Sequence, residues 1–189
     1  WDDCQVFLER LNERNPNLMA RLPSEAEWEH ACRAGTLTAT WVGDLEILGE
    51  CNAPLLDEIA WYGGNSGQDY ELTEGWDSSD WPNKQYPHTK AGTHEVRKKH
   101  ANPHGLHDML GNVYEWCVDM AGTYEAQAVT NPAPSTMGPG RVIRGGSWYV
   151  DARIVRAACR CGYSPDYRDF GLGFRLARGQ GGWEAGTRS

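Results

Sequence analysis

Between residues 36 and 107 the sequence shows no sustained hydrophobic period, and this long irregular stretch limits the folds that the chain can adopt. A helical bundle would show a 3.6-residue pattern over most of its length. The chain of 189 residues is instead rich in glycine, with 22 residues, and in tryptophan, with 9. Many turns around a few large aromatic anchors favour an irregular fold over a helical bundle.

Two helices are predicted near the start of the chain. In residues 3–14 one face is apolar, formed by Cys4, Phe7, Leu8 and Leu11. A second helix begins after Ser24, because Ser24 and Glu27 have the spacing of a capping box, and Gly35 supplies its stop. Its apolar face contains Trp28, Ala31 and Cys32.

The rest of the chain predicts short strands separated by loops. Strands or extended pieces are expected within 59–67, 106–119, 141–150, 152–160 and 172–177. Residues 68–104 are too long for an ordinary connection and predict an ordered functional loop or a long excursion. Residues 121–140 predict another loop, and the polar tail at 180–189 is expected to be loose.

The charge and the cysteines narrow the function classes. A net charge of −8 lacks the basic footprint of a nucleic-acid binder. The carboxylates could serve a hard cation such as calcium, although most are expected to solvate the surface. Six cysteines without a zinc-type spacing are interpreted mainly as small buried apolar residues. No segment has the length of a membrane span and no signal peptide is visible, but the chain opens at a helix start like a fragment. Cell surface and cytoplasm both stay open.

Three segments in order carry a family resemblance: "RLPSEAEWEHACRAG" (21–35), "NPHGLHDMLGNVYEW" (102–116), and the stretch 141–177 with "RVIRGGSW" and "GFRLA". Together they resemble the sulfatase-modifying, formylglycine-generating-enzyme family. The resemblance implies an α+β fold of the C-type-lectin-like kind, with two helices, small antiparallel sheets and much loop. It also implies a single domain over residues 1–179 that lacks the family's first strands.

The enzymatic residues of that family are not matched. The resemblance places the family's copper-binding cysteine pair within residues 146–155, and this segment contains no cysteine. Cys159 and Cys161 lie beyond the matching positions, and a reactive thiol must stand at the right place. A non-enzymatic protein is therefore favoured. The alternative is a formylglycine-generating-type oxidase, or a degenerate relative that acts as a binding or regulatory subunit.

The segment from Tyr149 to Gly179 lacks Lys, Glu, Gln, Met and Trp, whereas residues 1–148 contain 33 of these five types. At that rate the 31 residues of the segment would hold about seven. The pattern resembles variable proteins of diversity-generating retroelements, in which AAC codons become N-N-C codons that cannot encode those five residues. The alternative is a small strand-rich segment that avoids them by chance.

The resemblance to variable proteins implies an exposed, ligand-binding set of side chains between fixed residues. Tyrosines on a rigid scaffold supply adaptable contact area, as in antibodies, so the expected partner is a protein or another macromolecule. The expected set is Tyr149, Val150, Asp151, Ile154, Val155, Cys159, Cys161, Gly162, Tyr163, Asp166, Tyr167, Asp169, Phe170, Gly171 and Leu172.

A structural calcium site is implied by the same family. Carried over to this chain, its ligands are Asp108, Gly111, Val113 and Glu115, which would offer carboxylate and carbonyl oxygens. The alternative is that Asp108 and Glu115 cap a turn and pair with an arginine. Asn52 and Ala53 are weaker candidates for a second site.

Histidines and arginines also gather in this sequence. A transition-metal site is one interpretation of His88, His94, His100, His104 and His107, but their irregular spacing favours surface histidines. Bracing of loops is favoured over anion capture for Arg144, Arg156, Arg160, Arg168 and Arg175.

Overall fold

The structure, a computed structural model, describes residues 1–69, 73–124, 130 and 132–179, so the predicted tail lies outside the described residues. The helices are α1 (Asp2–Arg14) and α2 (Glu25–Arg33), with the short 3-10 helices η1 (Pro54–Glu58) and η2 (Ala152–Ile154). The strands are β1 (Ala20–Arg21), β2 (Trp76–Asp77), β3 (Lys90–Ala91), β4 (Tyr114–Met120), β5 (Arg141–Arg144), β6 (Arg160–Tyr163), β7 (Leu172–Gly173) and β8 (Ala177–Arg178). This confirms the predicted α+β class.

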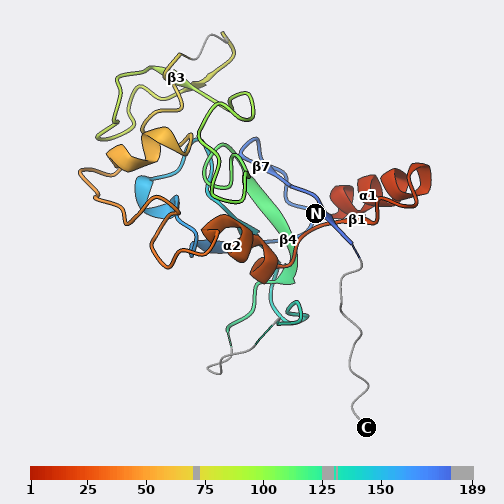
Figure 1. Cartoon of the computed structure of the whole chain (residues 1–189). Helices are drawn as coiled ribbons and strands as arrows, with labels where there is room; N and C mark the ends of the chain where they lie inside the picture. Colours follow the sequence, from red (N-terminus) through yellow and green to blue (C-terminus); the bar gives the residue numbers. More distant parts are fainter. Residues whose placement is uncertain (70–72, 125–129, 131, 180–189) are drawn as a thin grey trace.

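A four-stranded sheet in the order β6-β5-β4-β7 organises the fold. Strand β4, the long strand at the centre of Figure 1, pairs antiparallel with β5 and parallel with β7. Strand β6 pairs antiparallel with β5, which brings Cys161 opposite Ile143. There are also two two-stranded sheets, β1-β8 and β2-β3, and β1-β8 joins the segment between the two α-helices to the last described strand.

Helix α2 forms as the sequence predicts. Ser24 accepts a hydrogen bond from the backbone N–H of Glu27, and the Glu27 carboxylate accepts one from the backbone N–H of Ser24. The reciprocal capping box satisfies two donors that the helix itself leaves open. Trp28 on the buried face of α2 is almost fully enclosed, and the helix packs against β4 and β5. Figure 1 shows α2 beside β4.

Apolar side chains are buried on both faces of the sheet, because successive residues of a strand point to opposite sides. Val142 and Cys117 belong to the larger cluster, which also includes Trp28, Leu56, Ile59, Tyr62, Met109, Leu110 and Val155. Ile143 and Trp116 belong to the smaller cluster with Leu8, Ala20 and Leu22. In the described part of the chain, no helix is long and apolar enough to cross a membrane.

The strand predicted over 152–160 is wrong. Residues 152–154 form η2, a turn follows, and β6 begins only at Arg160. Val155, Ala157 and Cys159 are buried while the residues between them are exposed, so burial alternates as in a strand although the segment has no strand partner. Its backbone instead bonds to distant loops, for example from the Ala157 N–H to the Ala39 carbonyl.

Two other predicted extended pieces are shorter than expected. The stretch 172–177 divides into β7, which pairs with β4, and β8, which pairs with β1. The stretch 59–67 is mostly turn and contributes one isolated bridge, between Trp61 and Gly111. Residues 59–64 are buried although they form no continuous strand, so a hydrophobic run does not by itself require one.

Candidate functional site

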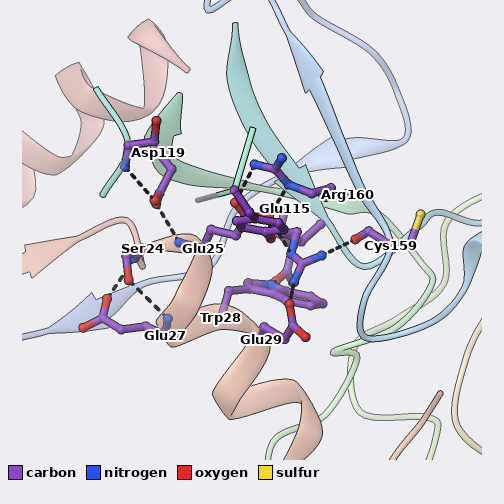
Figure 2. Close-up of polar contacts among 12 residues, drawn as sticks. Ser24, Glu25, Glu27, Trp28, Glu29, Glu115, Asp119, Cys159 and Arg160 are labelled. Carbon is purple, nitrogen blue, oxygen red and sulfur yellow. Dashed lines mark hydrogen bonds and ion pairs between the residues drawn. The ribbon is translucent and has the colours of Figure 1, made fainter. Parts of the chain in front are cut away.

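A buried ionic cluster ties α2 to the sheet and to the segment before β6 (Figure 2). Arg144 on β5 is fully buried and forms an ion pair with Glu29. Its Nε lies 3.5 Å from Glu25, and its Nη1 donates a 2.6 Å hydrogen bond to the carbonyl oxygen of Cys159. Arg144 therefore holds the backbone of a position that the sequence assigns to the variable set.

The same cluster extends to the start of β6. Arg160 donates from Nε and Nη2 to the two carboxylate oxygens of Glu25, each at 2.7 Å. Its Nη1 donates to the Gly122 carbonyl oxygen at 2.7 Å, and its guanidinium lies 4.4 Å from the centre of the Tyr124 ring. A planar guanidinium with several donors is suited to such bracing of loops.

Arg175 braces the loop that precedes β4. Its Nε and Nη2 donate to the two oxygens of Glu115 at 2.6 and 2.7 Å, and Nη2 also donates to the carbonyl oxygens of His107 and Asp108. The Trp28 indole N–H donates to Glu115 Oε2 at 2.6 Å. The other two arginines expected to brace are exposed: Arg156 and Arg168.

Three of the four predicted calcium ligands help to line a pocket of about 580 Å³: Asp108, Val113 and Glu115. Arg175 lines it as well, and Gly111 does not. Both Glu115 oxygens are already bound by donors, and Asp108 Oδ2 accepts the Arg97 backbone N–H at 2.7 Å. Glu115 therefore pairs with an arginine, Arg175, which is the alternative that the sequence left open. Within the described ranges, no group of three or more acidic, histidine or cysteine side chains is placed to hold a metal ion. Two of the predicted ligands are backbone carbonyl oxygens, so calcium binding by this set stays a prediction.

The remaining metal candidates have structural roles in this arrangement. Asn52 lies in a turn, and the Ala53 backbone N–H donates to the Tyr62 hydroxyl. His94 stacks on Trp61 with ring centres 3.7 Å apart. His88 is buried rather than on the surface as predicted, and burial, then the charge of Lys84, lowers its pKa.

The expected variable residues differ in exposure. Three of them are buried, so the expected exposure is wrong for Val155, Cys159 and Gly171. The exposed members are Gly162, Tyr163, Asp166, Tyr167 and Phe170. The half-buried members are Tyr149, Val150, Asp151, Ile154, Cys161, Asp169 and Leu172. Val155 packs in the larger apolar cluster and the Cys159 backbone lies against Arg144, whereas Gly171, directly before β7, is covered by the Tyr149 ring.

Two of these residues lie near Tyr114 on β4, because Leu172 pairs with Tyr114 and Cys161 packs against the same apolar cluster. Burial raises the pKa of Tyr114, and the nearby Cys161, Cys159, Tyr149 and Tyr163 raise it further. Tyr149 precedes η2, whereas Cys161 and Tyr163 lie on β6 and Leu172 lies on β7, so separate segments of the chain supply this part of the surface. We call the surface formed by Tyr149 and residues 161–172 the Tyr114 surface.

Asp169 connects two parts of the Tyr114 surface. Its Oδ1 accepts hydrogen bonds from the Tyr149 hydroxyl at 3.0 Å and from the Gly171 backbone N–H at 2.7 Å. A side chain at Gly171 would meet the Tyr149 ring, since a Cβ there would lie 2.3 Å from Cε1. Burial, then the bond to Asp169, raises the pKa of Tyr149. The loop after Asp169 is therefore held against Tyr149.

The excursion at 68–104 adds two aromatic residues that the sequence did not assign to the site. Trp76 on β2 lies with its ring centre 5.0 Å from that of Phe170, and the two residues are 54% and 57% exposed. Trp81 stacks on the buried Trp148 at 5.9 Å. In the sequence, the contacts of Trp76 and Trp81 were indicated only by the length of the excursion, which predicted an ordered functional loop. At the other end of the surface, Tyr163 and Tyr167 stack at 4.5 Å.

Comparison with known proteins decides the family. Residues 1–180 match the family model described as "Sulfatase-modifying factor enzyme 1-like domain". The chain belongs to this family. The formylglycine-generating enzyme of Streptomyces coelicolor is 33% identical over 190 residues, which cover 94% of this chain and 50% of that protein. The inactive C-alpha-formylglycine-generating enzyme 2 of Bos taurus is 31% identical, over 96% of this chain and 49% of that protein.

Among solved structures, this sulfatase-modifying-type domain is similar to Treponema denticola variable protein 1. The TM-score is 0.59 and the identity 36%, over 84% of this chain and 47% of that one. The resemblance to variable proteins seen in the sequence is thereby confirmed, together with the α+β, C-type-lectin-like fold. The chain spans about half the length of these relatives.

The cysteines of this family member are all free thiols. Four are buried, as predicted for small apolar residues: Cys32, Cys51, Cys117 and Cys159. Burial raises the pKa of Cys32 to about 12 and of Cys51 to about 11, which keeps both protonated at neutral pH. Cys161 differs, because a hydrogen bond from Cys159 lowers its pKa.

Proposed function

We propose that this protein is a non-enzymatic, ligand-binding variable protein whose segment 149–172 is diversified by a retroelement and contacts the ligand. The observation that carries the proposal is the restricted alphabet of this segment together with the place of its residues. Twelve of the fifteen candidate positions are exposed or half-buried, and many belong to the Tyr114 surface. The similarity to Treponema denticola variable protein 1 supports the same function.

The fixed residues hold the segment in a way that tolerates such changes. Arg144 binds the carbonyl oxygen of Cys159, and the Tyr114 backbone N–H donates to the Gly171 carbonyl oxygen at 2.7 Å. The Trp148 indole N–H donates to the carbonyl oxygen of Phe170 at 3.5 Å. Because these bonds reach backbone atoms, a new side chain at Cys159 or Phe170 leaves them in place, whereas a side chain at Gly171 would first have to displace the Tyr149 ring. Rigid aromatic side chains can then supply contact area at low entropic cost.

Exchange of exposed variable residues is expected to leave the fold intact. Replacing Tyr163, Tyr167 and Phe170 together by serine, which N-N-C codons encode, should change the free energy of unfolding by roughly 0.5 kcal/mol per site or less. Trp148→Ser removes one buried aromatic residue of the frame and should cost about 3–5 kcal/mol. Urea denaturation followed by circular dichroism compares the two proteins. Unfolding of the triple variant would contradict the proposal that these positions can be substituted without loss of the fold.

The surrounding DNA tests the origin of the segment. A diversified gene is expected to lie beside a reverse-transcriptase gene and a near-copy of the region encoding residues 149–172. In that near-copy, the codons for the variable positions should contain adenines, mainly as AAC. Sequencing of the locus decides this point, and the absence of both elements would argue for the alternative below.

The alternative function is a formylglycine-generating-type oxidase or a degenerate regulatory relative. It is favoured by the 33% identity to the Streptomyces coelicolor enzyme. Against it stands the segment 146–155, which has no cysteine where the family resemblance expects the copper-binding pair. We expect the protein incubated with copper and oxygen to leave a cysteine-containing substrate peptide unchanged by mass spectrometry. Conversion of the cysteine to formylglycine would establish the oxidase.

A further inference from the structure

A groove at one end of the Tyr114 surface has the chemistry of a cation-binding site. It encloses about 260 Å³, and its lining includes Tyr167, Asp169 and Leu172 from the variable set. Fixed residues, among them Trp116 and Phe174, complete its walls. The groove combines aromatic surface with the carboxylates of Asp3 and Asp169 and the guanidinium of Arg168. Four of its side chains belong to the segment proposed to contact the ligand: Tyr167, Arg168, Asp169 and Leu172.

The Asp169 carboxylate in this groove has no cationic partner among the residues that the structure describes. Its Oδ1 accepts hydrogen bonds from the Tyr149 hydroxyl and the Gly171 backbone N–H. Burial, then the nearby Asp169 carboxylate, also raises the pKa of Tyr167. The adjacent Arg168 is directed to Asp3, with 2.7 Å between Nη2 and Oδ2. By contrast, the more deeply buried Glu25 and Glu115 each bind an arginine. Asp169 is thus half-buried, and among the described residues no cationic side chain forms an ion pair with its carboxylate.

Aromatic rings beside this carboxylate favour a positively charged ligand group. The Tyr167 ring stacks on Tyr163 at 4.5 Å, and Tyr167 remains 39% exposed. The negative face of such a ring attracts a cation, most strongly where water is partly excluded. The net charge of −8 adds a longer-range attraction for basic partners.

We propose that this groove receives an arginine side chain of a protein partner, whose guanidinium binds Asp169 and lies against the Tyr167 ring. The inference rests on the proposed ligand-binding function and names the ligand's chemistry. Arginine suits the site better than lysine, because a planar guanidinium can bind a carboxylate and stack on an aromatic ring at the same time.

Small probes test the groove directly. We expect N-acetyl-arginine methylamide to shift the NMR signals of Tyr167, Asp169 and Leu172 in the intact protein. The citrulline analogue has nearly the same shape without the charge, and it should bind about tenfold more weakly or worse. Asp169→Asn should weaken binding of the arginine probe by a similar factor. Asp44→Asn removes one exposed carboxylate charge away from the groove and should leave the affinity unchanged.

Peptide selection separates this inference from the proposed function. A random peptide library panned against the wild-type protein should yield arginine-rich binders, and the same library panned against Asp169→Asn should yield binders without that enrichment. Binders that lack arginine enrichment on the wild-type protein would overturn the arginine site and leave ligand binding standing. Equal binding of the arginine and citrulline probes would also overturn it. Failure to obtain any binder from either protein would count against both proposals.

Discussion

Arg144→Ala is expected to lower the free energy of unfolding by about 3–5 kcal/mol, the cost of removing one partner from a buried ion pair. Arg144 is fully buried and lies against Glu29, Glu25 and the carbonyl oxygen of Cys159. Alanine would leave the carboxylate of Glu29 without this cation and the carbonyl without a donor. Since a small domain has only about 5–15 kcal/mol of stability, the variant should be partly unfolded at moderate urea concentration.

Arg156→Ala is the matched control for this variant. Arg156 is another of the five arginines that the sequence predicts to brace loops. It is exposed, and its Nε donates a hydrogen bond to the nearby Arg153 carbonyl oxygen. Its removal should change the free energy of unfolding by about 0.5 kcal/mol or less. Urea denaturation of both variants measures the difference. If Arg144→Ala were as mild as Arg156→Ala, the ionic cluster would not hold α2 to the sheet.

Gly111→Ala is expected to cost about 2–5 kcal/mol, through a steric clash and a strained backbone. A Cβ at Gly111 would lie 2.2 Å from the backbone oxygen and 2.9 Å from the backbone nitrogen of Trp61. These are backbone atoms of the isolated bridge between the two residues, so no flexible side chain can move aside. Gly111 also has a φ of +73°, which an L side chain rarely adopts.

Gly105→Ala separates the clash from the backbone strain. Gly105 has a similar φ of +75°, but a Cβ there would have no neighbour within 4 Å. It should therefore show the strain alone, about 1–2 kcal/mol. Thermal denaturation of the two variants gives the difference, which we attribute to the approach of Trp61. Equal losses would mean that the chain shifts to accommodate the alanine at Gly111.

Local signals in the sequence predicted those elements whose cause is local. Helix α2 follows from Ser24, Glu27 and an apolar face, all within a few residues of one another. The segment 152–160 misled for a related reason: its alternating burial has the period of a strand, although the burial comes from loops that bond to it from elsewhere. Alternating burial shows that successive side chains point to opposite sides. A segment becomes part of a β-sheet only when its backbone also bonds to a partner strand.

The candidate site was predicted in part. The restricted alphabet pointed to the segment 149–172, and the Tyr114 surface includes much of it. Trp76 was not predicted, because its contact with Phe170 depends on how the excursion folds back. The burial of Val155 and Cys159 was also missed. Which amino acids N-N-C codons can encode does not indicate which residues of a turn face the core.

The sequence by itself determined the family, the two helices with the capping box of α2, and the five residue types absent from residues 149–179, because each of these depends on residues that are neighbours in the chain. Only the tertiary structure decided which arginines brace the fold, since Arg144 and Glu29 meet across 115 residues of chain. It also decided that Glu115 binds Arg175 and that Asp169 keeps a charge without a cationic partner among the described residues. Such pairings depend on distances between segments, which burial and packing set only after the chain has folded.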